Sequence, residues 1–588
     1  MWRRVGIAAL QGALLWGLYA AVDTGRWPAT APGLYVALVT VIVLVPLLYY
    51  LVSGLEAPRN RVWTALAVAS IVLAGIGLHH GAYVAGPLVN RAEGAGQAPT
   101  GYALVVAVLC FHALPFAQAF LVNGDWRVRY PDLFRFAWRN ALLVALGILF
   151  CGVFWLLLGL WAQLFRMLGI GVFVDVFFDA RFAIPATTVA AGVGIQLAGS
   201  VERLETALRE QILALLKWLA PLAALILGLF SIALLVKTPE LLAANQRTIS
   251  ASWLLWLVAM NVLLLNAAYQ DGEAVKPYPR WLGRALRWLV PLLLVVASIA
   301  AYAVAVRIGE YGFTTSRVWA GLVAVIAIVY AAGYAWASFR HGAWMNGMGH
   351  VNVLVALLTI ASLLLLLTPL LSPYRLAAAS QFDRVLGSSD AEDVDPFITL
   401  RFDTGAYGRD RLGRLAELKA HPRSDEIRRL AAAARAATQR HLARVNVEKV
   451  AIPDLLLRAY PAGTDIEPAL RDSIAKVFGE EIGWMRVCSE AAGMPCAVLF
   501  ADLNADGVAE AIVFSANPGG LIFRRIDADW RAAGWLQPGT WVGPEDLHAR
   551  LEKGDVRVVE PEWSVLMLGD RALRFRELEP RINRSGGP

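Results

Sequence analysis

Apolar stretches of about twenty residues recur along the chain before Tyr374, and they constrain the fold more than any other feature. Only helices and closed barrels satisfy every backbone polar group inside a bilayer, and a helix needs roughly 20 apolar residues to cross about 30 Å of hydrocarbon. We therefore predict eleven transmembrane helices. They cover approximately residues 5–22, 33–55, 62–88, 101–122, 140–163, 183–199, 211–236, 249–269, 285–306, 317–338 and 350–372.

The composition agrees with an integral membrane protein. Of the 588 residues, 58% are hydrophobic and 17% are charged, which is too little polar cover for one soluble domain. A pI of about 9.2 is typical of nucleic-acid binding as well, but the basic excess lies in short loops between the apolar stretches. We expect the lipid bilayer, and no nucleic acid, as the partner of this region.

The loop charges test the weakest span, residues 183–199, and set the orientation. If all eleven stretches cross and the N-terminus is cytoplasmic, 16 Lys and Arg residues lie inside and 8 outside. Without the sixth span the numbers become 12 and 12, which removes the bias that normally orients membrane proteins. Eleven spans place the C-terminus outside. The first stretch, behind Arg3 and Arg4, also fits a cleaved secretory signal, which leaves the later topology unchanged.

The chain from Arg375 onward has ordinary globular composition. The expected fold is an all-α polytopic membrane bundle, residues 1–374, followed by a soluble α+β domain, residues 375–588. Helix patterns cover residues 424–445 and 543–554. Strand patterns, expected to form a small antiparallel sheet, cover residues 497–503, 510–515, 520–526, 564–569 and 572–578.

Cys488 and Cys496 are the two cysteines of this second domain, whereas Cys110 and Cys151 lie in predicted spans. On the outer side of the membrane, Cys488 and Cys496 can close a small disulfide loop. The alternative is a pair of free buried thiols.

The hairpin loop after the first of those strands resembles a calcium loop. Asp502, Asn504 and Asp506 alternate as calcium ligands do, and Gly507 stands where an EF-hand turns sharply. Strands rather than helices flank the loop, and Val513 stands where an EF-hand has Glu. Two interpretations stay open: a plain hairpin turn, or calcium bound by Asp502, Asn504, Asp506 and Glu510. No cofactor is otherwise required.

Two charged segments next to the spans form a candidate outer-face polar cluster. A helix after the fifth span would place Asp175 and Asp179 on one face, with Arg166 and Arg181 close enough to neutralise them. This segment is either a cation, proton or substrate site, or an interfacial helix with local ion pairs.

The second charged segment, "RIGEYGFTTSRVWA", joins the ninth and tenth spans and contributes Arg307, Glu310 and Arg317. Arg307 and Glu310 are three apart and are expected to pair, so a tight turn that fixes two spans explains the segment by itself. His79 and His80 emerge on the same side of the predicted topology. An outward-facing polar vestibule below the second domain is the functional alternative.

The runs "WAQLFRMLGIGVFVDVFF", "RIGEYGFTTSR" and "QFDRVLGSSDAEDVDPFITLRFDTGAYGRDRLGRL" resemble the polytopic bacterial family known as domain of unknown function 4153. The resemblance extends to about Leu415, and the Tyr-Gly-Phe-Thr turn with Arg317 is its best motif. It implies a multi-pass protein of the bacterial inner membrane with a periplasmic C-terminal domain. It supplies no catalytic residues.

The expected function is transport, or envelope sensing and assembly. The sequence contains no nucleotide-binding P-loop, G-x-S-x-G or H-E-x-x-H motif. Two alternatives stay open. One is a membrane-embedded transferase that takes a lipid-linked donor at the periplasmic face, with Asp23, or Asp175 and Asp179, as the base. The other is a scaffold that docks an envelope protein.

Overall fold

The structure is a computed structural model. It describes residues 2–84, 99–125, 128–200, 202–243, 250–272, 277–387, 394–437, 440, 456–480, 495–514, 519–526, 529–536, 544–558, 566–568 and 571–573. The chain forms two compact units, Met1–Ala443 and Arg444–Pro588.

Within the described residues, eleven helices are long and apolar enough to cross a membrane, which confirms the predicted number. The short sixth stretch is among them, as the loop charges predicted. The spans are α1 (Trp2–Asp23), α2 (Pro32–Val52), α3 (Arg59–Tyr83), α4 (Pro99–Asn123), α5 (Tyr130–Met167), α7 (Ala180–Gly199), α8 (Glu202–Ala243), α9 (Ala251–Tyr269), α10 (Arg280–Leu289) continued by α11 (Leu292–Tyr311), α12 (Thr315–Phe339) and α13 (Met348–Leu367).

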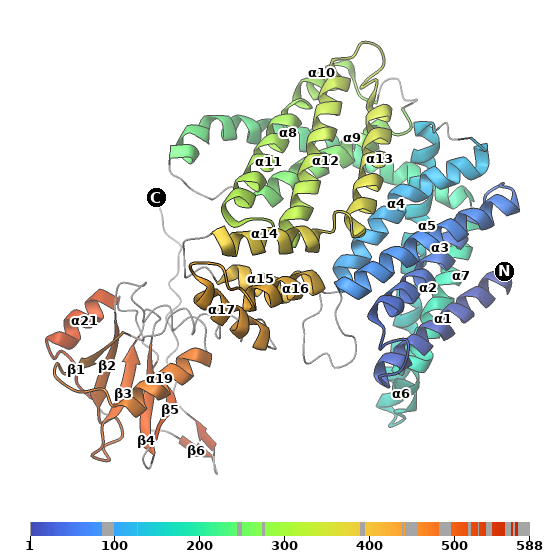
Figure 1. The fold of residues 1–588 in the computed structure, drawn as a ribbon. Helices are drawn as coiled ribbons and strands as arrows, with labels where there is room; N and C mark the ends of the chain where they lie inside the picture. Colours follow the sequence, from blue (N-terminus) through green and yellow to red (C-terminus); the bar gives the residue numbers. More distant parts are fainter. Residues whose placement is uncertain are drawn as a thin grey trace. The chain divides into compact units, whose positions relative to one another are not determined.

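The spans form two groups. Helices α8 to α13 share a core around Leu293, Val296, Ala331 and Tyr334, all of which are fully buried. Helices α1 to α7 make up the second group, and Figure 1 shows them beside the first. Helix α13 packs on α4 and α5, so it joins the two groups.

Small residues explain how the short span α7 is held in the second group. A β-carbon on Gly192 would lie 3.0 Å from that of Ala8 on α1, and one on Gly194 would lie 2.8 Å from Phe150 on α5. Because small side chains let helix backbones approach closely, they favour association inside a membrane, where the hydrophobic effect does not drive packing. Helix α7 therefore packs between α1 and α5.

Four shorter helices follow the last span in the described part of the first unit. They are α14 (Pro373–Gly387), α15 (Asp395–Phe402), α16 (Gly405–Ala416) and α17 (Ser424–Ala436). Helix α14 packs on α12 and α16 packs on α3, where Gly405 approaches the carbonyl of Tyr83 so closely that a β-carbon would lie 2.3 Å away. Figure 1 shows α14 running across the ends of α11 and α12. We call α14 to α17 the cap, and the adjoining end of the bundle the cap end.

The cap belongs to the first compact unit. The sequence division after Tyr374 marks the place where the apolar runs stop, and the last candidate span ends at Leu367. The division by contacts falls later, after Ala443, because the cap helices are amphipathic and bury their apolar sides against one another and the spans.

The second unit contains a five-stranded mixed sheet in the order β1-β2-β3-β4-β5. The strands are β1 (Leu457–Tyr460), β2 (Cys496–Ala501), β3 (Glu510–Phe514), β4 (Gly520–Ile526) and β5 (Asp529–Leu536). The predicted antiparallel pairing holds for β2, β3 and β4. Strands β1 and β5 were not predicted; β5 pairs antiparallel with β4, but β1 pairs with β2 in parallel, so the prediction of an antiparallel sheet was wrong at this edge. A short pair, β6 (Leu566–Leu568) and β7 (Arg571–Leu573), stands apart from this sheet.

Alternating side chains of the sheet form two small cores. Val498 and Val513 pack with Leu470 and Ile474 of α19 (Pro468–Glu480). Residues one position along the strands, such as Ala497, face α21 (Pro544–Glu552) instead. This period of two is what a strand imposes on its side chains.

Candidate functional site

The turn between α11 and α12 is held by α12 itself. Gly312 has φ +69 and ψ 180, a conformation open to glycine and strained for other residues. Arg317 donates from Nη1 to the carbonyls of Tyr311 and Gly312, over 3.1 and 3.0 Å. Thr314 caps α12 by accepting from the N–H of Arg317. The geometry of this backbone turn therefore depends on the guanidinium of Arg317.

The same turn is clamped by the cap. Gln381 of α14 donates from Nε2 to the carbonyls of Tyr311 and Phe313, over 3.1 and 2.8 Å. The N–H of Phe313 donates to Ser380 Oγ at 2.9 Å, and Arg384 Nη1 donates to the carbonyl of Glu310 at 2.7 Å. These bonds fix the start of α12 against α14.

An aromatic cluster at the end of α3 joins the other side of the cap. The Nδ1 atom of His79 lies 2.9 Å from the carbonyl of Leu367, so Nδ1 carries the proton and donates. The hydroxyl of Tyr407 then donates to His79 Nε2, over 3.0 Å. The ring of His80 stacks on Tyr102 of α4, with centroids 4.1 Å apart.

A cavity of about 520 Å³ lies at the cap end. Residues of the α11–α12 turn segment and of the aromatic cluster at the end of α3 both line it. Its polar lining comes from four spans and from the start of the cap: His79, His80, Tyr102, Thr315, Ser316, Thr359, Ser372 and Tyr374. Burial raises the pKa of Tyr374, so its phenol is protonated at neutral pH. The Oγ atom of Ser372 is buried and has no hydrogen-bond partner among the described residues.

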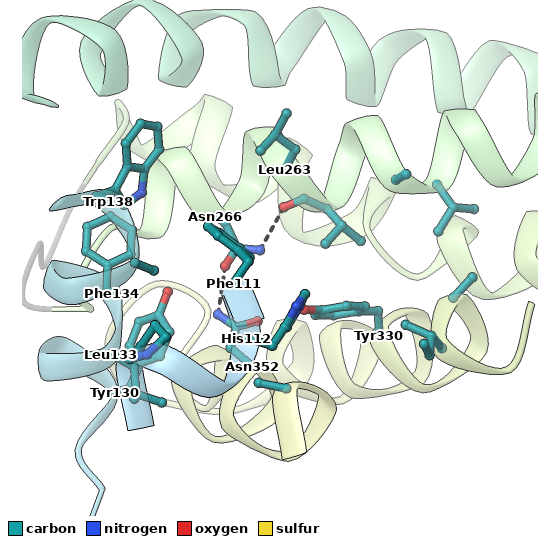
Figure 2. A pocket seen from close by; sticks show the side chains of 18 of the residues that line it. Phe111, His112, Tyr130, Leu133, Phe134, Trp138, Leu263, Asn266, Tyr330 and Asn352 are labelled. Carbon is teal, nitrogen blue, oxygen red and sulfur yellow. Dashed lines mark hydrogen bonds between the residues drawn. The ribbon is translucent and has the colours of Figure 1, made fainter. Parts of the chain in front are cut away.

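A second cavity, of about 420 Å³, lies between α4 and α5 on one side and α9, α12 and α13 on the other. Figure 2 shows it surrounded by aromatic side chains, including Phe134, Trp138 and Tyr330. We call it the inner cavity. Its position is the boundary between the two helix groups.

The two asparagines that line the inner cavity are bonded to each other and to Tyr334 behind them. Asn266 Nδ2 donates to Tyr334 Oη, Tyr334 Oη donates to Asn352 Oδ1, and Asn352 Nδ2 donates to Asn266 Oδ1, each over 2.7 Å. Figure 2 shows the bond between the two asparagines. His112 donates from Nδ1 to the carbonyl of Val108 on its own helix. An occupant therefore meets a mainly apolar surface.

The two cavities meet on α12. Val323 and Ile326 line both of them, the cap-end cavity continuing toward Thr315 and the inner cavity toward Tyr330. We call the two adjoining cavities together the α12 groove. Both cavities have a mainly apolar surface, and hydroxyl and imidazole side chains gather at the cap end.

The predicted outer-face cluster divides into two separate places. Helix α6 (Val172–Phe178) ends before Asp179, so the prediction of one helix carrying Asp175 and Asp179 was wrong. Asp179 instead caps α7, where its carboxylate accepts the N–H of Arg181 at 2.7 Å. Among the described residues, no ion pair joins either Asp to Arg166 or Arg181.

The other half of the predicted cluster lies at the turn. Arg384 donates to the backbone carbonyl of Glu310, and Arg317 binds backbone carbonyls. The pairing of Arg307 with Glu310 stays a prediction. Helix α6 packs on α5 and α7, away from these contacts. The structure does bring His79 and His80 together with Thr315 and Ser316 of the turn segment, in the cap-end cavity.

The predicted calcium loop folds as a tightly bonded hairpin. Asp502 Oδ2 accepts from the N–H of Gly507 at 2.9 Å, and Asp506 Oδ1 accepts from Val508 at 2.8 Å. Glu510, which is 4% exposed, accepts from Leu503 N and Asn504 Nδ2. No group of three or more His, Cys, Asp or Glu residues in the described ranges is placed to hold a metal ion. Calcium binding stays a prediction.

The predicted disulfide is described at one end only. Cys496 is disulfide-bonded, whereas Cys110 and Cys151 are free. Cys488 lies outside the described residues, so its pairing with Cys496 stays a prediction.

Sequence reasoning missed Ser372 and Tyr374, which line the cap-end cavity. A serine directly before Pro373 is a typical helix start, and this signal was present in the sequence. Nothing local indicates that this helix start faces a cavity, because much of the remaining wall comes from α3, α4 and α12, which are distant in the sequence.

Comparison with known proteins identifies the membrane unit. No curated protein and no solved structure matches the chain. The family described as Domain of unknown function (DUF4153) matches residues 12–406, which include all of the spans from α2 to α13, most of α1, and the first two helices of the cap. This match, over more than half of the chain, establishes that the protein belongs to the DUF4153 family.

Proposed function

We propose that this membrane protein binds an amphiphilic lipid in the α12 groove and takes part in its transport within the bacterial cell envelope. One observation carries the proposal: Val323 and Ile326 line both cavities, so the polar side chains gathered at the cap end and the mainly apolar inner cavity adjoin each other along α12. An amphiphile has the same division, with a polar group at one end and a hydrocarbon chain at the other.

The length of the groove supports a lipid. Its lining on α12 extends from Thr315 to Tyr330, and a helix rises about 1.5 Å per residue, so the groove follows about 22 Å of helix. The hydrocarbon core of a bilayer is about 30 Å thick, so this distance exceeds one leaflet. The apolar part of the occupant is therefore an extended chain.

The hydrogen bonds of the inner cavity support the same occupant. Asn266 and Asn352 line the cavity, but they bond to each other and to Tyr334. Because these amides already have hydrogen-bond partners, a hydrocarbon chain can lie beside them without leaving either amide unpaired.

The position of the groove favours transport over the other expected roles. Transporters commonly bind their substrate at the boundary between two helix groups that rock against each other. Here the groove lies between α4 and α5 of one group and α9 and α12 of the other. No Asp or Glu lines either cavity in the described part of the chain, so a transferase acting there would lack a carboxylate base.

We place the cap end and the second unit on the periplasmic side of the inner membrane. The odd number of candidate spans and the 16 to 8 distribution of Lys and Arg support this orientation. Alkaline phosphatase fused after Pro588 is expected to be active, and a cytoplasmic reporter at the same position inactive. The reverse pattern would refute the orientation and leave the groove unaffected.

Filling the groove tests the proposed function. Val323→Trp places an indole where the two cavities join, and we expect the purified protein to lose co-purified lipid, measured by native mass spectrometry. Val325→Trp is the matched control, because Val325 is 53% exposed on the same helix. Equal lipid retention by the two variants, when both are folded, would contradict the proposal.

A further inference from the structure

We infer that the cap-end cavity binds an anionic group, a phosphate or carboxylate, that forms the head of the lipid. This inference rests on the proposed function and adds the charge of the substrate. Two helix N-termini converge on the cavity: Thr315 and Ser316 come from the first turn of α12, and Tyr374 comes from the first turn of α14.

Helix N-termini favour anions for a physical reason. The first N–H groups of a helix have no partner within it, and the aligned peptide dipoles place about half a positive charge there. Phosphates and carboxylates commonly bind at such ends. Helix α4 also starts at this cavity, where Gly101 and Tyr102 form part of the lining.

Ser372 is the independent observation that points to a ligand. It is fully buried, lines the cavity directly before α14, and its Oγ has no hydrogen-bond partner among the described residues. A buried hydroxyl without a partner is costly, so such groups in proteins usually have one. An anion held at the start of α14 would accept a hydrogen bond from this hydroxyl.

The opposing helix ends do not cancel this preference. Helices α3 and α13 present their C-termini to the cavity, but the carbonyl of Leu367 already accepts from His79. The carbonyl of Pro369, just beyond α13, accepts from Arg375 Nη1 at 3.1 Å. With these two carbonyls bonded and no carboxylate in the described lining, no negatively charged side chain of the lining opposes an anion.

The connection to the inner cavity distinguishes a lipid from free phosphate. Below Ser316 the lining becomes apolar, through Trp319 and Leu322 to Val323. A free anion would leave this surface uncovered, whereas a lipid would cover it with its chain. The proposed ligand is therefore an anionic lipid.

The test compares lipids with the same chains and different heads, an anionic one and a zwitterionic one. The full-length protein in detergent is titrated with phosphatidylglycerol, with phosphatidylcholine and with inorganic phosphate, and bound ligand is measured by native mass spectrometry. Phosphatidylglycerol is expected to bind at least tenfold more tightly than phosphatidylcholine. Inorganic phosphate is expected to bind weakly. Phosphatidylcholine binding as tightly as phosphatidylglycerol, or phosphate binding without phosphatidylglycerol, would overturn the inference.

Ser372→Ala removes the unpartnered hydroxyl and is expected to weaken phosphatidylglycerol binding roughly tenfold, since hydrogen bonds to charged groups are strong. Ser231→Ala is the matched control, because Ser231 is equally buried with an unpartnered Oγ but lies on α8, outside the lining of both cavities. Equal affinities of the two variants would overturn the inference.

The two proposals can fail separately. If Val323→Trp abolishes the binding of both lipids while Ser372→Ala changes neither, the groove binds lipid and the anion site is refuted. If Val323→Trp leaves phosphatidylglycerol binding intact, the proposed function itself is refuted.

Discussion

Arg317 and Gln381 donate to the same acceptor, the carbonyl of Tyr311, each over 3.1 Å. Arg317 belongs to α12, which lines the groove, and Gln381 belongs to α14, whose first turn lines the same groove. One turn between two spans therefore fixes the relative position of the two helix starts that converge on the cap-end cavity.

Substitution of Gly312 is expected to loosen this turn. Gly312→Ala forces alanine into a glycine conformation and places its β-carbon 2.8 Å from Ser380 Oγ, so we expect a loss of about 1–3 kcal/mol of stability. Thermal unfolding of the detergent-solubilised protein measures this loss of stability. Gly309→Ala is the control, since Gly309 lies on α11 with open space around it. Equal unfolding temperatures of the two variants would show that the turn is not strained in this way.

The network of Asn266, Tyr334 and Asn352 is expected to behave as one unit. Asn352→Leu leaves two buried partners unsatisfied and should cost about 1–2 kcal/mol. In the Asn352→Leu background, Asn266→Leu should lower stability clearly less than it does in the wild type, because Asn352, one of its hydrogen-bond partners, is already absent. Unfolding in increasing denaturing detergent compares the single and double variants. Strictly additive losses would argue against a closed network.

The second unit is expected to lose stability in alkali through Tyr460. Its hydroxyl donates to His548 Nδ1 over 2.7 Å, and burial raises its pKa against the opposing charge of Arg458. Because the folded pKa is the higher one, the stabilisation is complete below the unfolded pKa of about 10 and is lost as the pH rises through the folded value.

Tyr460→Phe removes this titrating group. The unfolding temperature of wild type should exceed that of the variant at about pH 8, and the difference should narrow above about pH 10. A difference that stays constant over that range would mean that Tyr460 does not titrate in the fold.

Cys488 and Cys496 are expected to form the disulfide of the second unit. Cys496 is bonded in the structure, and Cys110 and Cys151 are free. Thiol labelling of the unfolded protein, followed by peptide mapping, should modify Cys110 and Cys151 before reduction and all four cysteines after it. Labelling of Cys488 without reduction would exclude the pairing.

The sequence predicted the spans because crossing a bilayer requires a long apolar helix, and length and composition are local properties. The short span α7 needed a global argument, the distribution of loop charges. The structure shows α7 as a helix long and apolar enough to cross a membrane. The cap was harder to assign. Its helices are polar enough to resemble a soluble domain, and only their contacts with α3 and α12 place them in the membrane unit.

The details that sequence reasoning missed depend on distant residues. Strand β1 pairs with β2 across a long insertion, so no local pattern signals their parallel pairing. Asp179 was predicted to lie on the face of a helix, but it caps the start of α7. A short polar side chain is common both at the N-cap and on the exposed face of a helix, so the sequence alone does not distinguish the two positions. The cap-end cavity combines α3, α4, α12, α13 and α14, and no single segment reveals it.

An experimental density map of the protein in nanodiscs that contain phosphatidylglycerol tests the central claim most directly. The predicted result is elongated density along α12, with a compact head beside Ser372 and a chain that passes Val323 toward Tyr330. A groove that is closed by side chains, or a map with lipid only around the outside of the bundle, would contradict the account.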